Sequence, residues 1–179
     1  KREPVTLGAP VRMQISKVCI LGGTGFVGRH LTARLAAQGV ACRIPSRHPH
    51  RHRDLKLLPG CEPLEADIFD SKSLARALQG CQAAINLVGI LNPSGAAGFR
   101  RMHIELVDIL VDACRLAGVR RLLHMSALNA DASHGKSEYL RSKGEGENRA
   151  HTAGGATAAV TSFRPSVIFG PGDSFFNRF

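Results

Sequence analysis

The chain has 179 residues, 44% of them hydrophobic, which suits one domain with a sizeable core. Lys and Arg number 24 against 14 Asp and Glu, and the formal charge of +10 favours anionic partners without choosing among them. No apolar run approaches the roughly 18 residues that a membrane-spanning helix needs, so no transmembrane segment is expected. The five cysteines are scattered and odd in number, which argues against a disulfide framework or zinc site and favours a reducing, cytoplasmic compartment.

The two ends of the chain differ from its middle. Residues 1–14 are polar, contain prolines and lack the apolar segment of a signal peptide, so we expect a flexible tail. Residues 15–179 are expected to form one domain. The last stretch, GPGDSFFNRF (170–179), ends among apolar residues without a polar tail, which predicts the start of a C-terminal part that is truncated here.

Short apolar runs alternate with helical patterns along the chain. The predicted strands cover residues 17–21, 41–45, 63–66, 83–87, 121–125 and 157–163. The predicted helices run from a glycine-rich turn to about Gln38, over 71–78, over about 98–117, and onward from Ser137. Strands that alternate with helices, joined by right-handed crossovers, predict an α/β fold with a doubly wound parallel sheet of the Rossmann type.

The stretch KVCILGGTGFVG (17–28) places three glycines between the first strand and the first helix. In dinucleotide-binding folds, one glycine turns the chain out of the strand, one lets a pyrophosphate approach the backbone, and one lets the helix pack on the strand. The helix N-terminus then offers free N–H donors to the phosphates. The alternative is a turn that merely packs. We predict that a dinucleotide contacts Gly22, Thr24, Gly25, Phe26, Val27 and Gly28.

Four motifs, in this order, resemble the extended and atypical short-chain dehydrogenases/reductases, the NAD-dependent epimerase/dehydratase group. They are the G-x-x-G-x-x-G turn, Asp67-Ile68 with the N-x-x-G run at 86–89, the Y-x-x-S-K signature at 139–143, and RPSVIFGPGD at 164–173. The resemblance implies that the truncated C-terminal part binds the substrate. It also implies further cofactor contacts at Asp67, Ile68, Leu87, Val88, Gly89, Lys143, Pro165 and Ser166.

The end of the second predicted strand favours NADP(H), with NAD(H) as the alternative. NAD sites usually carry an acid there, whereas this chain has Ser46 and Arg47, and a guanidinium would pair with a 2′-phosphate. The competing interpretation is a solvated basic loop that includes Arg51 and Arg53. The alternating histidines 48, 50 and 52 are expected to face solvent, and no metal site is predicted.

Tyr139 and Lys143 are four residues apart, so a helix would place them on one face. The resemblance makes them the catalytic pair, in which the lysine ammonium would lower the tyrosine pKa for proton exchange with a substrate carbinol. Ser126 is the candidate third residue. The position where the family commonly has the catalytic hydroxyl matches Ala127, and His103 stands where the family usually has a structural asparagine.

These departures resemble one branch of the family, the NADPH-binding accessory subunit of respiratory complex I and its bacterial homologues. Three functions therefore stay open: an NADP(H)-dependent oxidoreductase or epimerase acting on a small molecule, a cofactor-retaining structural or assembly protein, and an NmrA-like redox-sensing regulator. A protein complex or homodimer would fit the last two, and the second allows a peripheral place at the inner membrane. No DNA-reading motif is present, so nucleic acid is not an expected partner.

Overall fold

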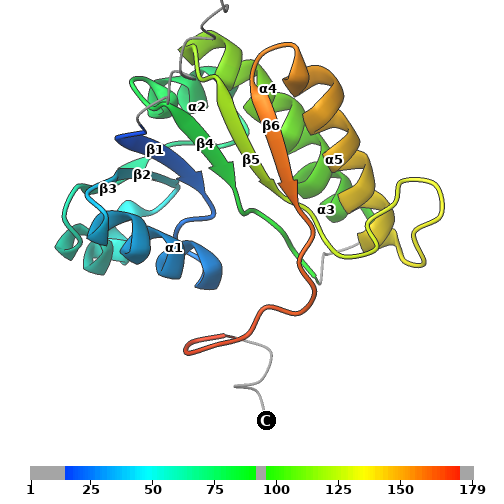
Figure 1. The fold of residues 1–179 in the computed structure, drawn as a ribbon, viewed down its shortest axis with the longest axis horizontal. Coiled ribbons are helices and arrows are strands. Elements are labelled where there is room, and N and C mark those ends of the chain that lie inside the picture. The colour runs from blue at the N-terminus through cyan, green and yellow to red at the C-terminus, as the bar shows by residue number, and fades with distance from the viewer. Residues whose placement is uncertain (1–14, 92–95, 174–179) are drawn as a thin grey trace, which may run out of the picture.

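The short apolar runs become the strands of one parallel sheet (Figure 1). The computed structural model describes residues 15–91 and 96–173, so the predicted tail and residues 174–179 lie outside the described residues. The sheet has six strands in the order β3-β2-β1-β4-β5-β6, and all five pairings are parallel. The strands are β1 (Lys17–Leu21), β2 (Ala41–Ser46), β3 (Cys61–Glu65), β4 (Ala83–Asn86), β5 (Arg121–Met125) and β6 (Ala159–Phe163).

Helical segments connect the strands, and several end at the residues that the sequence indicates. They are α1 (Phe26–Ala37), the 3₁₀ segment η1 (Pro49–Leu57), α2 (Ser71–Leu78), α3 (Ala96–Arg100), the π-helical turn η2 (Arg101–Glu105), α4 (Leu106–Ala117) and α5 (Glu138–Gly155). The Asp70 carboxylate caps α2 by accepting from the Lys72 N–H at 3.0 Å, and the Ser137 hydroxyl caps α5 at 3.2 Å. Gly118 ends α4 with a φ of +70°.

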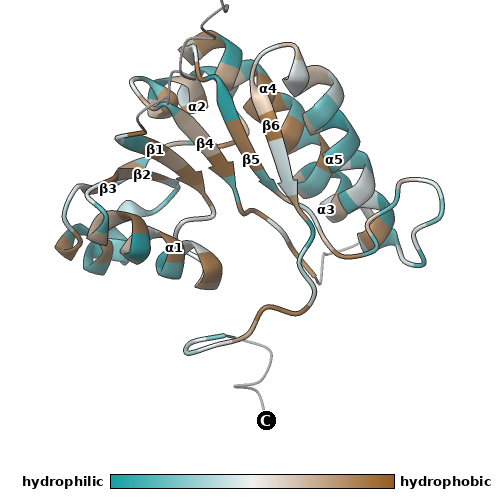
Figure 2. Ribbon diagram, viewed as in Figure 1, coloured by the Kyte–Doolittle hydropathy of each residue, from teal (hydrophilic) through white to brown (hydrophobic). Residues whose placement is uncertain are grey.

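The side chains of alternate β1 residues pack into two different cores, because successive side chains of a strand point to opposite faces of the sheet. Cys19 and Leu21 join the large core under α2, α4 and α5. Val18 and Ile20 join a smaller core with Leu31 of α1 and its neighbours on the opposite face. Figure 2 shows the hydrophobic strand β1 inside and long hydrophilic stretches on α5 outside. The doubly wound prediction is therefore confirmed. Within the described residues, no helix combines the length and apolarity needed to cross a bilayer.

Apart from strand ends that are displaced by one or two residues in β2, β3, β4 and β6, two predicted elements differ from the structure. The long helix expected over 98–117 is interrupted by the π-helical turn η2, which lies between α3 and α4. The backbone oxygen of His103 in this turn approaches α5 so closely that a Cβ on Gly146 would lie 2.0 Å from it. The basic stretch, a loop in the competing interpretation, forms η1 with a kink at His52. Arg29 of α1 forms an ion pair with Asp54 of η1, which fastens this segment beside the glycine turn.

Candidate functional site

The glycine turn places the first turn of α1 at the carboxyl edge of the sheet. Gly22 has a φ of +78°, and a Cβ there would lie 3.1 Å from the carbonyl carbon of Leu87. A Cβ on Gly28 would lie 2.3 Å from the Gly22 oxygen, so Gly28 lets α1 pack on the turn. Gly25 is less crowded, because its Cβ would come no closer than 3.3 Å to another atom. The first turn of α1 has no acidic residue and no capping side chain, so its N–H groups can meet an anion.

The first of two clefts at this edge lies between the glycine turn, the end of β2 and the loop after β3. We call it the basic cleft; its volume is about 680 Å³. Seven of the predicted cofactor-binding residues line it: Gly22, Thr24, Ser46, Arg47, Asp67, Ile68 and Val88. Residues that are up to 66 positions apart in sequence thus share one cleft, as the resemblance implies.

Cationic side chains dominate the basic cleft. Arg47 and Arg51 line it from the β2 side, and Arg101 lines it from η2. The Arg101 guanidinium stacks 4.4 Å from the centre of the Phe69 ring. Asp67 is the one carboxylate among the described lining residues, and it accepts a hydrogen bond from the Phe69 N–H at 2.9 Å. The cleft is therefore suited to a ligand with anionic groups.

The histidines of the basic stretch have partners of their own. The rings of His48 and His50 meet edge to face with their centroids 5.7 Å apart. Nδ1 of His52 lies 3.2 Å from the Arg29 guanidinium. In the part of the chain that the structure describes, no cluster of three or more His, Cys, Asp or Glu side chains could hold a metal ion.

The second cleft lies between α1, the ends of β4 and β5, α5 and the segment after β6. We call it the apolar cleft; its volume is about 580 Å³. It collects the other predicted cofactor-binding residues apart from Gly25 and Gly28, together with all three predicted catalytic residues: Phe26, Val27, Leu87, Gly89, Ser126, Tyr139, Lys143, Pro165 and Ser166. Gly25 lies at the start of α1, and Gly28 packs under it.

The surroundings of Tyr139 and Lys143 differ from those expected of the catalytic pair in the pKa of Tyr139. The Lys143 side chain is buried, with 4% of the residue exposed, and its ammonium donates a hydrogen bond to the Met125 carbonyl. Burial lowers the Lys143 pKa to about 8, against a smaller opposing effect of Glu147. The expected lowering of the Tyr139 pKa is wrong for this structure, because burial raises that pKa. The phenol is therefore held in its protonated form.

The depressed pKa of Lys143 predicts a pH-dependent stability difference. Between pH 8 and about 10.5 the unfolded chain binds more protons at this residue than the folded chain, so its contribution to stability rises with pH. Replacing Lys143→Met removes this dependence together with the donor to the Met125 carbonyl, so the gain in the free energy of unfolding that the substitution brings should be about 3 kcal/mol smaller at pH 10.5 than at pH 7. Urea denaturation of both proteins across this range checks the sign, and a gain that grows with pH contradicts it.

His103 joins the loop after β4 to α5, a role that sequence reasoning missed. Its Nε2 accepts from the Ile90 N–H at 3.2 Å, so Nδ1 carries the proton and donates to the Ser142 hydroxyl at 2.9 Å. Ser142 in turn donates to the Tyr139 carbonyl at 2.9 Å. Burial, helped by the nearby Lys143, lowers the His103 pKa to about 4 and keeps the ring neutral. The sequence signal for this role was a histidine, His103, at a position where the family usually has an asparagine.

Ser126 lines the apolar cleft, but its hydroxyl oxygen is buried. Burial raises the pKa of the neighbouring Glu147, yet the Ser126 hydroxyl and the Arg164 guanidinium outweigh this and hold that pKa below its usual value. The Ser126 hydroxyl lies near enough to Glu147 to lower that pKa, but no described group meets the Ser126 oxygen at hydrogen-bonding geometry. This hydroxyl therefore has no hydrogen-bond partner among the described residues, and Ala127 beside it adds only a methyl group to the cleft.

The segment after β6 closes the apolar cleft on its α1 side. Its first part is tied to the end of β5, where the Leu128 N–H donates to the Pro165 carbonyl at 2.8 Å. Its last part reaches α1, where Nε2 of His30 lies 2.9 Å from the Pro171 carbonyl oxygen. A Cβ on Gly170 would touch the Phe26 ring at 3.6 Å. The segment therefore runs from the end of β6 toward the start of α1 (Figure 1).

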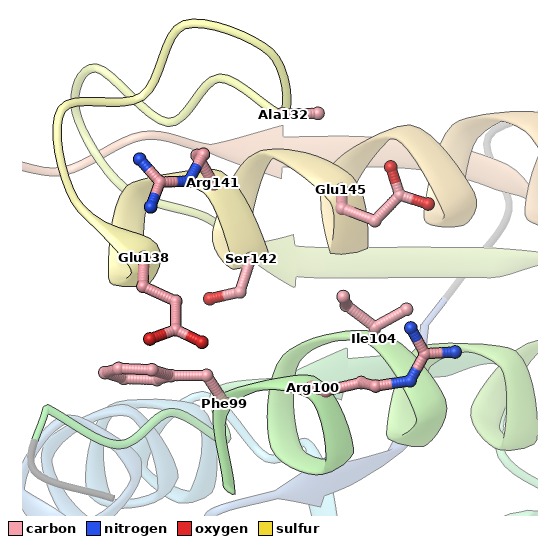
Figure 3. Close-up of a pocket in the computed structure, with 8 residues that line it drawn as sticks. All are labelled: Phe99, Arg100, Ile104, Ala132, Glu138, Arg141, Ser142 and Glu145. Atoms are coloured by element: carbon pink, nitrogen blue, oxygen red, sulfur yellow. The ribbon is translucent and has the colours of Figure 1, made fainter. Parts of the chain in front are cut away.

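A third cleft, of about 420 Å³, lies between α3, η2 and α5 (Figure 3). Its lining charges balance in number, because Arg100 and Arg141 are matched by Glu138 and Glu145. Three of these groups are already engaged: Arg100 pairs with Glu105 at 3.2 Å, Arg141 donates to the Gly135 carbonyl at 2.8 Å, and Glu145 pairs with Arg149 at 2.9 Å. None of the predicted site residues lines this cleft.

Comparison with known proteins agrees with this geometry. A family model described as NAD(P)H-binding matches residues 22–157. Ceramide reductase of Caulobacter vibrioides is 32% identical over 160 residues, which cover 88% of this chain and 48% of that protein. NADH dehydrogenase [ubiquinone] 1 alpha subcomplex subunit 9, mitochondrial, of Mus musculus is 32% identical over 167 residues, 89% of this chain and 42% of that protein. The chain thus spans about half the length of these relatives.

Solved structures share the fold. MoeE5 in complex with UDP-glucuronic acid and NAD superposes with a TM-score of 0.76 at 23% identity, covering 90% of this chain and 59% of that chain. UDP-glucuronic acid 4-epimerase from Bacillus cereus in complex with NAD superposes with a TM-score of 0.70 at 18% identity, covering 87% of this chain and 58% of that chain. The resemblance to complex I subunits is therefore confirmed in sequence, and the resemblance to the epimerase/dehydratase group is confirmed in fold.

Proposed function

The chain belongs to the NAD(P)H-binding family, and on that premise we propose that it binds NADP(H) across the basic and apolar clefts and acts as an oxidoreductase or epimerase. One observation carries the proposal: the predicted residues, spread between Gly22 and Ser166, line two clefts at one edge of the sheet. The strand order reverses between β1 and β4, beside the glycine turn. Open parallel sheets bind dinucleotides at such a point.

The charges of the basic cleft support NADP(H) over NAD(H). β2 ends at Ser46, and Arg47 follows where an NAD site usually has an acid. A 2′-phosphate there would meet the Arg47 guanidinium and the Ser46 hydroxyl, with Arg51 on the same wall. The start of α1 would meet the pyrophosphate through its backbone N–H groups.

The apolar cleft supports proton transfer by Tyr139. The bound nicotinamide would supply or accept a hydride in this cleft. In the reducing direction, the Tyr139 phenol gives its proton to the carbonyl oxygen while the carbonyl carbon receives the hydride, and the product is the alcohol. The raised pKa of Tyr139 suits this donor role, because the phenol starts protonated. Lys143 holds the Met125 carbonyl and lies beside the Gly89 backbone, so it would position the end of β5 against the loop after β4.

Replacing Tyr139→Phe in the full-length protein tests this role. With NADPH and 9,10-phenanthrenequinone as the probe carbonyl, we expect kcat to fall by at least about a hundredfold, since positioned acid–base groups contribute 10²–10⁴. The dissociation constant of NADPH should stay within about twofold, because the change removes one oxygen and keeps the ring that meets Phe99 and His103. An unchanged kcat would remove Tyr139 from the reaction.

A second candidate function is retention of the nucleotide as a structural part of a larger complex. Two observations favour it: Ala127 supplies no hydroxyl to the cleft, and Lys143 is engaged by the Met125 carbonyl. A mouse relative named as a NADH dehydrogenase subunit is of comparable similarity to the reductase relative. This candidate predicts recovery of NADP(H) from the denatured protein, no turnover, and co-fractionation with a membrane-associated assembly. Turnover that Tyr139→Phe abolishes would instead select the enzyme.

A further inference from the structure

Two stacked side chains in the basic cleft were not among the predicted cofactor-binding residues. The Arg101 guanidinium in η2 lies 4.4 Å from the centre of the Phe69 ring, in the loop after β3. Both side chains line the cleft, and they come from opposite sides of β1 in the strand order, because η2 follows β4. The stack therefore joins the two walls of the basic cleft.

The Phe69 ring is held firmly by its own loop and by the core. The Phe69 N–H donates to the Asp67 carboxylate at 2.9 Å, and the Asp67 N–H donates to the Ser73 hydroxyl at 3.2 Å. The ring itself packs against the large core. A guanidinium stacked on such a ring is already restricted in orientation, so it loses little further freedom when a ligand binds.

The Arg101 guanidinium has no carboxylate partner among the described residues. Its neighbour Arg100 differs, because it lines the third cleft and pairs with Glu105 at 3.2 Å. A guanidinium is planar, and the Phe69 ring covers one of its two faces. The other face is therefore open to a ligand in the cleft.

The position of the stack indicates which part of the cofactor it meets. The proposed function gives the pyrophosphate to the start of α1 and the 2′-phosphate to Arg47 and Ser46. Phe69 lies beyond these groups, after the edge strand β3. The part of the adenosine that still needs a partner is its flat base, and guanidinium groups stack on the faces of such rings.

We propose that Arg101 is a further cofactor-binding residue, whose guanidinium packs between the Phe69 ring and the adenine of the bound dinucleotide. The proposal rests on the proposed function and adds a contact to it. The two arginines then have different roles. Arg47 meets the 2′-phosphate and distinguishes NADP(H) from NAD(H), whereas Arg101 meets a base that both cofactors carry.

Replacing Arg101→Ala in the full-length protein, freed of bound nucleotide, tests this role by calorimetric titration. We expect the dissociation constants of NADPH and NADH to rise by similar factors of about tenfold, as the loss of one stacked base contact predicts. Arg101→Lys should lose nearly as much, because an ammonium keeps the charge but not the plane. Arg100→Ala is the matched control, and it should change both constants by less than about twofold.

Replacing Phe69→Leu tests whether the ring acts through the guanidinium. Alone, we expect this change to weaken the binding of both nucleotides by about threefold. Added to Arg101→Ala, it should weaken binding no further, because the group that the ring positions is already gone. Circular dichroism confirms that each variant is folded. Losses that simply multiply in the double variant would overturn the proposed stack.

The other outcomes separate this proposal from the function beneath it. Unchanged affinities in Arg101→Ala overturn the adenine contact. A loss confined to NADPH would move Arg101 to the 2′-phosphate, and full affinity in Arg101→Lys would make it a charge contact with the pyrophosphate, so either result also overturns it. In each of these cases the unsubstituted protein still binds NADPH and the proposed function stands. Failure of the unsubstituted protein to bind NADPH would instead contradict the proposed function.

Discussion

Arg47→Glu is expected to weaken NADPH binding by at least about a hundredfold while changing NADH binding by less than about threefold. The substitution removes the cation at the end of β2 that would pair with the 2′-phosphate. It adds a carboxylate that repels this phosphate but can accept from the ribose hydroxyls of NADH. Each hydrogen bond to a charged group contributes roughly 1.5–3 kcal/mol, so two of them correspond to the expected loss. Fluorescence titration of both nucleotides with the full-length protein measures the effect.

Arg53→Glu is the matched control for this experiment. Arg53 lies in η1, only six positions further along the chain, but it lines neither cleft. The same change of net charge should therefore alter NADPH binding by less than about threefold. Equal losses for NADPH and NADH in Arg47→Glu would contradict the 2′-phosphate assignment. Equal losses in the two variants would mean that only the overall charge of η1 and its surroundings matters.

Gly25→Val is expected to abolish nucleotide binding while the protein stays folded. The nearest atom to a Cβ at Gly25 would be 3.3 Å away, so the fold can accommodate the side chain with a small shift. The branched side chain would occupy space at the start of α1, where the pyrophosphate is expected to approach the N–H groups. Circular dichroism and thermal unfolding report the fold, and NADPH titration reports binding.

Gly28→Ala supplies the contrast. Its Cβ would lie 2.3 Å from the Gly22 oxygen and 2.5 Å from the Cα of Gly23, so α1 would have to move off the turn. We expect lost stability in this variant, whereas in Gly25→Val we expect lost binding with stability kept. If Gly25→Val bound NADPH with unchanged affinity, the glycine turn would serve packing alone.

The strand pattern was predictable because each buried strand is a short apolar run bounded by turn residues. β1 and β5 have the predicted bounds. The π-helical turn η2 was not predictable, because its cause lies in α5: Gly146 there has no Cβ and admits the His103 oxygen. Spacing along the sequence carries no information about this contact between helices. Similarly, the ion pair of Arg29 with Asp54, which fastens η1, joins residues that no local pattern connects.

The membership of the two clefts was also predictable, because each motif follows a strand and the carboxyl ends of parallel strands meet at one edge. The electrostatics were not. The four-residue spacing places Tyr139 and Lys143 on one face of α5, but the Lys143 ammonium donates to the Met125 carbonyl at the end of β5. The direction of the Tyr139 pKa therefore follows from burial. Whether Tyr139, Lys143 and Ser126 take part in a reaction stays a prediction.

The most direct test of this account is a calorimetric titration of the full-length protein, freed of bound nucleotide, with NADPH and with NADH. We predict one NADPH bound per chain, at least about tenfold more tightly than NADH, because only NADPH carries the phosphate that Arg47 and Ser46 would meet. Tighter binding of NADH would contradict the assignment of the basic cleft. No binding of either nucleotide would contradict the central claim that these two clefts form a dinucleotide site.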